Sequence, residues 1–82
     1  MLFRVIFLYL VGQRVIRCHL ARLMGERKMK IADVARATGL HRNTVTLLYK
    51  ETAQQVDLNT VDLLCELFDC EVGDLLERVK QS

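Results

Sequence analysis

The chain has 82 residues, enough for one small domain and too few for a large cleft between lobes or for a membrane channel. Its composition, 51% hydrophobic and 27% charged, is that of a globular protein rather than a disordered one. The net charge of +2 hides an asymmetry: residues 1–50 carry ten basic and two acidic side chains, whereas residues 51–82 carry two basic and eight acidic ones. This asymmetry indicates that the N-terminal half binds a polyanion.

The chain contains no proline, which favours helices joined by short connections over an all-β sandwich. An odd number of cysteines without a C-x-x-C pair is typical of free thiols in a reducing compartment, so we expect a cytoplasmic protein. We expect no metal and no cofactor, because no common zinc site has the spacing of Cys18, His19, Cys65 and Cys70. No Ser/His/Asp set, paired carboxylates or phosphate-binding glycine loop is visible, so the chain is not expected to be an enzyme.

Residues 1–14 are an apolar N-terminal extension, set apart from a domain expected in residues 15–82. The segment MLFRVIFLYLV is rich in β-branched and aromatic side chains, which favours a strand. Its apolar run is too short to span a bilayer, and no small-residue cleavage pattern follows it. Three alternatives stay open: a strand covering a core face of its own domain, a strand pairing across a two-fold axis in a dimer, or a signal, membrane-associating or disordered segment.

After this extension the pattern is mainly helical. Residues 15–20 alternate weakly between apolar and polar side chains, which predicts a short strand that runs into a helix. Helices are predicted from apolar side chains at helical spacing over residues 20–29, Ile31–Thr38 and Leu58–Phe68, and a further short helix opens at residues 41–44. Asp57 is the expected N-cap of the helix Leu58–Phe68. Residues 70–72 are a predicted turn, and 73–79 are either a last helical turn or a strand.

The two short helices around Gly39 carry the most informative pattern. Ala35 is the small residue that lets the second helix approach, Gly39 suits a left-handed turn, and Leu40 is apolar beside it. Val45 and Leu48 repeat at helical spacing and are expected to hold the second helix in place. The stretch MKIADVARATGLHRNTVTLLYK therefore predicts a helix-turn-helix whose second helix has a free polar face.

The free face carries side chains that can recognise DNA. It presents Arg42, Asn43 and Thr46, with Leu47 at its edge. Arginine can pair bidentately with guanine and asparagine with adenine, while threonine and leucine can contact a thymine methyl group. An exposed helix N-terminus that bears Asn43 and Thr44 can also hold a backbone phosphate. The basic charge of this half favours DNA binding over an ordinary helical hairpin with a solvated polar face.

These residues resemble the Cro/repressor-type helix-turn-helix family, also called the XRE family. The likeness rests on the Arg-Asn-Thr-Val segment, the Leu-Tyr-Lys-Glu-Thr loop, the VDL helix start and the terminal Cys-Glu-Val-Gly-Asp-Leu-Leu-Glu segment, and it covers about residues 15–79. It implies a mostly α fold, a five-helix repressor-like DNA-binding domain, here with a short N-terminal β element. Its second and third helices would be Ile31–Thr38 and 42–50.

The resemblance also implies which positions contact DNA. Its base-reading positions fall on His41, Arg42, Asn43, Thr46 and Leu47. Its phosphate-contacting positions fall on Lys30, Thr44, Lys50, Thr52, Gln54 and Gln55. Two departures stand out. Ile31 and Lys30 replace the Gln and the Ser or Thr cap that many relatives have there, and relatives generally lack residues 1–14. His41 lies where a Ser or Thr cap is usual, so we interpret it as a capping or surface residue rather than a metal ligand.

We therefore expect a sequence-specific DNA-binding transcriptional regulator, a repressor that binds a palindromic operator in double-stranded DNA as a homodimer, with no membrane partner. One alternative is the antitoxin component of a toxin–antitoxin pair, in which an apolar surface binds the toxin. Another is a protein-interaction module that has kept this fold without binding DNA.

Overall fold

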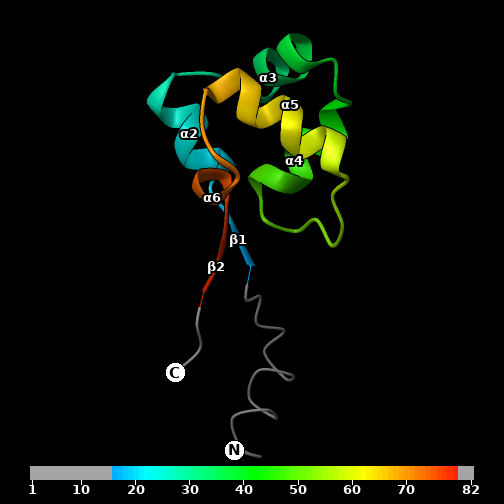
Figure 1. Ribbon diagram of the computed structural model, residues 1–82. Coiled ribbons are helices and arrows are strands. Elements are labelled where there is room, and N and C mark those ends of the chain that lie inside the picture. The colour runs from blue at the N-terminus through cyan, green and yellow to red at the C-terminus, as the bar shows by residue number, and fades with distance from the viewer. Residues whose placement is uncertain (1–15, 80–82) are drawn as a thin grey trace, which may run out of the picture.

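The computed structural model describes residues 16–79, which form five helices and two short strands (Figure 1). Their order along the chain is β1 (Ile16–Cys18), α2 (Leu20–Glu26), α3 (Ile31–Thr38), α4 (Arg42–Tyr49), α5 (Leu58–Phe68), α6 (Val72–Leu75) and β2 (Leu76–Arg78). The predicted mostly α fold with a short N-terminal β element is thus confirmed. Among these described residues, no helix is long and apolar enough to cross a bilayer. The predicted strand in residues 1–14 lies outside the described residues.

β1 and β2 form a short antiparallel ladder that joins the two ends of the described chain. Its register pairs Ile16 with Arg78, Arg17 with Glu77 and Cys18 with Leu76. The two strands run side by side away from the helical body (Figure 1). The sequence left residues 73–79 open between a helical turn and a strand. The structure forms both, because α6 ends at Leu75 and β2 begins at the next residue.

Two predicted helix ends need correction. α2 ends at Glu26, three residues before the predicted end at residue 29, because the chain turns through Lys28 in a left-handed conformation with φ 54°. The Met29 N–H then returns to the Met24 carbonyl at 2.9 Å, which closes the turn. α4 ends at Tyr49, and Lys50 is its C-cap rather than its last residue.

The helix-turn-helix signals are confirmed in the structure. α3 has the predicted bounds, and Gly39 follows it with φ 78°, a left-handed conformation that glycine adopts without steric cost. The Gly39 N–H donates to the Ala35 carbonyl at 2.8 Å, which completes the end of the helix. α5 also has its predicted bounds and its predicted cap. The Asp57 carboxylate accepts the Thr60 N–H at 2.8 Å, and this bonding lowers the pKa of Asp57.

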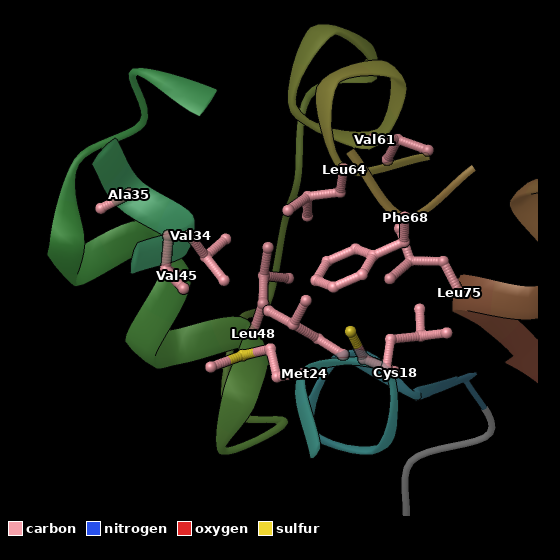
Figure 2. Packing of buried hydrophobic residues seen from close by; sticks show 12 residues of the cluster. Cys18, Met24, Val34, Ala35, Val45, Leu48, Val61, Leu64, Phe68 and Leu75 are labelled. Carbon is pink, nitrogen blue, oxygen red and sulfur yellow. The ribbon is translucent and has the colours of Figure 1, made fainter. Parts of the chain in front are cut away.

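One continuous core receives side chains from β1 and from every helix (Figure 2). The Phe68 ring lies in this core and points toward the Leu48 side chain of α4. Its members are Cys18, Leu20, Leu23, Met24, Val34, Ala35, Val45, Leu48, Val61, Leu64, Phe68 and Leu75. Burying one large aliphatic side chain contributes roughly 1.5–3 kcal/mol, so this cluster fixes α4 in one orientation on α3 and α5.

Candidate nucleic-acid interface

α4 has a buried face and an exposed face, as the sequence predicts. Val45 and Leu48 are buried, and Val45 lies beside Val34 and Ala35 of α3 (Figure 2). On a helix, residues at i, i+3 and i+4 share a face, so the residues between these anchors face away from the core. Asn43 shares the outer face with Thr46 and Leu47, which follow it at i+3 and i+4, and Arg42 lies at the edge of this face in the first turn. Both Arg42 and Asn43 are exposed.

The predicted base-contacting residues differ in how free their side chains are. Within residues 16–79, the side chains of Arg42 and Asn43 have no hydrogen-bond or ion-pair partner. Leu47 is exposed at the edge of the same face. Thr46 is half-buried, and its hydroxyl donates to the Arg42 carbonyl at 2.9 Å. The side chains nearest the start of α4 are therefore the most available to a ligand.

His41 is the N-cap of α4. Its Nδ1 accepts the Asn43 N–H at 3.1 Å, which satisfies one of the free donors at the start of the helix. The capping interpretation of His41 is therefore confirmed. The ring is also exposed, so capping does not remove it from the surface that α4 presents.

The predicted phosphate-contacting residues lie on two segments that flank the helix pair. Four of them are exposed at the end of α4 and in the loop that follows it, and these are Lys50, Thr52, Gln54 and Gln55. Lys30 is exposed at the start of α3, whereas Thr44 is half-buried.

The two departures from the family pattern at the start of α3 have a structural explanation. Asp33 replaces the missing Ser or Thr cap in part, because its carboxylate accepts the Lys30 N–H at 2.8 Å. Ile31 packs against the core, so its side chain is a hydrophobic anchor where many relatives have Gln.

The basic side chains in the described N-terminal half fall into two groups. Four already have partners: Arg17 with Glu51, Arg22 with Glu26, Arg27 with the Leu67 and Phe68 carbonyls, and Arg36 with Asp33. The other four have no ion-pair or hydrogen-bond partner for their side chains within residues 16–79, and these are Lys28, Lys30, Arg42 and Lys50. Sequence reasoning missed Lys28, because nothing in the string RK distinguishes a bound arginine from the free lysine after it.

A second feature that the sequence analysis missed is the environment of Glu51. This residue follows the C-cap of α4, and its carboxylate accepts hydrogen bonds from Arg17 Nε at 2.7 Å and Nη2 at 3.0 Å. The Cys18 N–H donates to the same carboxylate at 3.1 Å. These contacts lower the pKa of Glu51 to about 2, with Arg17 as the largest cause. The carboxylate therefore stays ionised next to the end of α4.

Comparison with known proteins decides the family. The family model of the Cro/C1-type HTH DNA-binding domain matches residues 19–81, which is more than half of the chain and includes all five described helices. The chain belongs to this family. The expected helix-turn-helix identity is thereby confirmed, and α3 and α4 form the helix-turn-helix within this five-helix domain.

The Cro/C1-type chain is also similar to a curated protein, "Uncharacterized HTH-type transcriptional regulator YozG" of Bacillus subtilis (strain 168). The two are 26% identical over 55 residues, which is 67% of this chain and 66%, just under two thirds, of the relative. No solved structure matches the chain significantly. The base and phosphate contacts assigned to individual residues of this DNA-binding domain stay predictions.

Proposed function

We propose that the chain is a sequence-specific transcriptional repressor that binds a palindromic operator as a homodimer. The observation that carries this proposal is the first turn of α4, where Arg42 and Asn43 are exposed without protein partners while Val45 and Leu48 fix the opposite face. A rigidly held helix with free bidentate side chains suits the edges of base pairs in the major groove.

The distribution of free positive charge supports the same proposal. Lys28, Lys30, Arg42 and Lys50 flank or belong to the helix pair α3–α4, and no acidic residue occurs between Asp33 and Glu51. Phosphate contacts from such side chains orient a domain on the duplex, whereas base contacts select the sequence. Thr52, Gln54 and Gln55 follow in an exposed loop and extend this proposed phosphate surface.

The homodimer completes the proposal, because one short recognition helix offers few base contacts. Two-fold regulators place two such helices in successive turns of the major groove and read inverted repeats. We further propose that residues 15–82 form the DNA-binding domain and that residues 1–14 are an extension that pairs the two protomers.

Selection of bound duplexes from a random DNA pool, with the full chain, tests the function directly. We expect an enriched inverted repeat whose half-site centres lie about one helical turn, or about 10 base pairs, apart. An enriched motif without inverted symmetry would contradict the dimeric mode. Absence of any enriched motif would contradict sequence-specific binding.

Light scattering of the full chain and of a chain that starts at Val15 tests the role of the extension. We expect a dimer for the first and a monomer for the second. Two monomers would exclude strand pairing between protomers, and two dimers would place the interface within residues 15–82.

A further inference from the structure

Glu51 lies between the two segments that the proposed function places on DNA. α4 ends at Tyr49 with Lys50 as its C-cap, and the loop with Thr52, Gln54 and Gln55 begins directly after Glu51. The Glu51 N–H donates to the Leu48 carbonyl at 3.2 Å, and the chain reverses at this point. Whatever fixes Glu51 therefore fixes both the end of α4 and the start of the loop.

The backbone of Glu51 is in an unusual conformation for its residue type. Its φ of 58° lies in the left-handed region, where a side chain crowds its own carbonyl and where glycine usually ends a helix. Lys28 has the same conformation without a side-chain partner among residues 16–79, so the role of Glu51 follows from its side-chain contacts and not from its φ value.

Those contacts all come from β1. The planar Arg17 guanidinium donates to both carboxylate oxygens, and the Cys18 N–H donates to Oε1. The N–H of the next residue, His19, donates to the Leu75 carbonyl on the β2 side. Since successive N–H groups of a strand point to opposite edges, the Cys18 N–H lies on the outer edge of β1. The Glu51 carboxylate thus occupies this edge and ties the end of α4 to the ladder.

We infer that Glu51, held by Arg17 and the Cys18 N–H, is a positioning residue that sets the orientation of α4 and of the following loop for operator binding. The inference rests on the proposed function, because it assigns α4 to the operator. Arg17 acts in it through Glu51 and not by contacting DNA. This positioning role differs from that of an ordinary surface ion pair, because the loss of an ordinary pair would leave the orientation of α4 unchanged.

A positioning residue and an ordinary surface ion pair predict opposite changes in operator affinity for the substitution Glu51→Gln. Glu51→Gln removes a negative charge beside α4, so simple electrostatics predicts tighter binding to every duplex. A positioning role predicts weaker binding to the operator, by about tenfold, because a small displacement of α4 separates its side chains from the base edges. Binding to random duplex should stay unchanged or become slightly tighter, so the ratio of operator to random affinity falls.

Arg17→Gln tests the other half of the pair, and Arg22→Gln is its matched control. Both arginines form an ion pair with a glutamate, their side chains are 51% and 54% exposed, and each substitution removes one positive charge. Arg22 pairs with Glu26 within α2, donates to the Asp74 carbonyl at 3.4 Å, and has no hydrogen bond or ion pair with Glu51. We expect Arg17→Gln to lower the operator-to-random ratio about as much as Glu51→Gln, and Arg22→Gln to leave that ratio within about twofold. The double variant R17Q/E51Q should lose no more than either single one.

The measurement is a titration of the full chain with the selected operator and with random duplex, combined with ¹H–¹⁵N spectra of each free variant. We expect amide shifts confined to α4, the loop after it and β1. Should Glu51→Gln fail to fold, Arg17→Lys, which keeps the charge and loses the two-pronged geometry, should give a smaller loss of the same ratio. Operator binding by folded Glu51→Gln that equals or exceeds wild-type binding would overturn the inference.

Failure of the proposed function is a separate result. If the wild-type chain prefers no duplex, sequence-specific binding is refuted, and the spectra of the free variants still decide whether Glu51 positions α4. Shifts in α4 and the loop would support that role, and their absence would overturn it.

Discussion

At the scale of single residues, the first turn of α4 combines a structural and a recognition role without conflict. His41 caps the helix through the backbone N–H of Asn43, which leaves the Asn43 side chain free. Arg42 contributes its carbonyl to the Thr46 hydroxyl and likewise keeps its guanidinium free. Side-chain substitutions at these two positions therefore test recognition with little effect on the helix.

We predict that Arg42→Ala and Asn43→Ala each weaken operator binding by about 1–3 kcal/mol and relax specificity at particular base pairs. The reason is that each removes a side chain that can pair bidentately with a base, while the His41 cap and the Val45 anchor stay in place. Titrations with duplexes that differ from the operator at one base pair at a time measure the effect. If both variants kept the wild-type affinity and sequence preference, the assignment of α4 as recognition helix would be wrong.

Glu51 leads to a prediction about acid stability. Its pKa is lowered from an ordinary value near 4.5 to about 2 in the folded protein, chiefly by Arg17. A lowered folded-state pKa contributes stability that is present above about pH 4.5 and is lost as the pH falls toward 2. Near neutral pH, Glu51→Gln should lower the free energy of unfolding by about 1 kcal/mol, the upper end for a partly exposed pair.

Urea unfolding of wild type and Glu51→Gln, followed by circular dichroism at several pH values, measures this contribution. The difference between the two proteins should shrink as the pH falls below about 4.5 and vanish near pH 2. The carboxylate of Asp57, whose pKa is also lowered, is present in both proteins and cancels. A difference that stays constant down to pH 2 would show that the carboxylate charge is not the cause.

At the scale of elements, the helices could be predicted because their signals are local. Gly39 ends α3 and Asp57 begins α5, and the apolar spacing of α4 is contained within eight residues. The contacts that join elements have no such signal. Arg17 and Glu51 are 34 residues apart, His19 and Glu77 are 58 apart, and both pairs are polar and partly exposed. The candidate DNA-facing residues on α4 were found from periodicity, whereas the residues that hold α4 were not.

The contact between α2 and α5 is another of these unpredicted connections. The Arg27 guanidinium donates to the Leu67 carbonyl at 3.1 Å and to the Phe68 carbonyl at 2.9 Å, and lies 5.6 Å from the centre of the Phe68 ring. It thus supplies donors and positive charge to the C-terminus of α5, where carbonyl groups lack helical partners. The neighbouring Lys28 is exposed and has no such contact among the described residues.

We predict that Arg27→Ala lowers the free energy of unfolding by about 1–2 kcal/mol, through loss of these hydrogen bonds and of the cation–π contact. Lys28→Ala is the control, because it removes the same charge from the same turn and should change stability by less than about 0.5 kcal/mol. Thermal and urea unfolding of the two variants measure both effects. Equal losses of stability would refute the specific role of Arg27.

At the scale of the whole molecule, the structure refines the charge asymmetry of the sequence. Several basic side chains of the N-terminal half are bound to other residues, and the free ones border α3 and α4. Acidic side chains without ion-pair partners among residues 16–79 belong to α5, to its N-cap Asp57 and to the segment after it, and these include Asp62, Glu66, Asp69 and Glu71. Only the free cations are expected to displace counterions from DNA.

This division predicts the salt dependence of DNA binding. Each cation that contacts a phosphate contributes about 0.9 to the slope of log affinity against log salt concentration. Lys28→Ala, Lys30→Ala and Lys50→Ala should therefore each flatten the slope by about 1 and weaken binding to all duplexes alike. Arg22→Ala removes an equal charge that is already paired with Glu26, so its slope should stay near that of wild type.

The measurement is the affinity of each variant for operator and for random duplex between 50 and 200 mM salt. This range distinguishes the variants, because affinity falls steeply across it when a protein contacts several phosphates. The test is most demanding for Lys28, because the structure and not the sequence assigns it to the free group. A slope for Lys28→Ala equal to that of Arg22→Ala would remove Lys28 from the proposed phosphate surface. A flattened slope for Arg22→Ala would instead show that pairing within the protein does not decide which cations meet DNA.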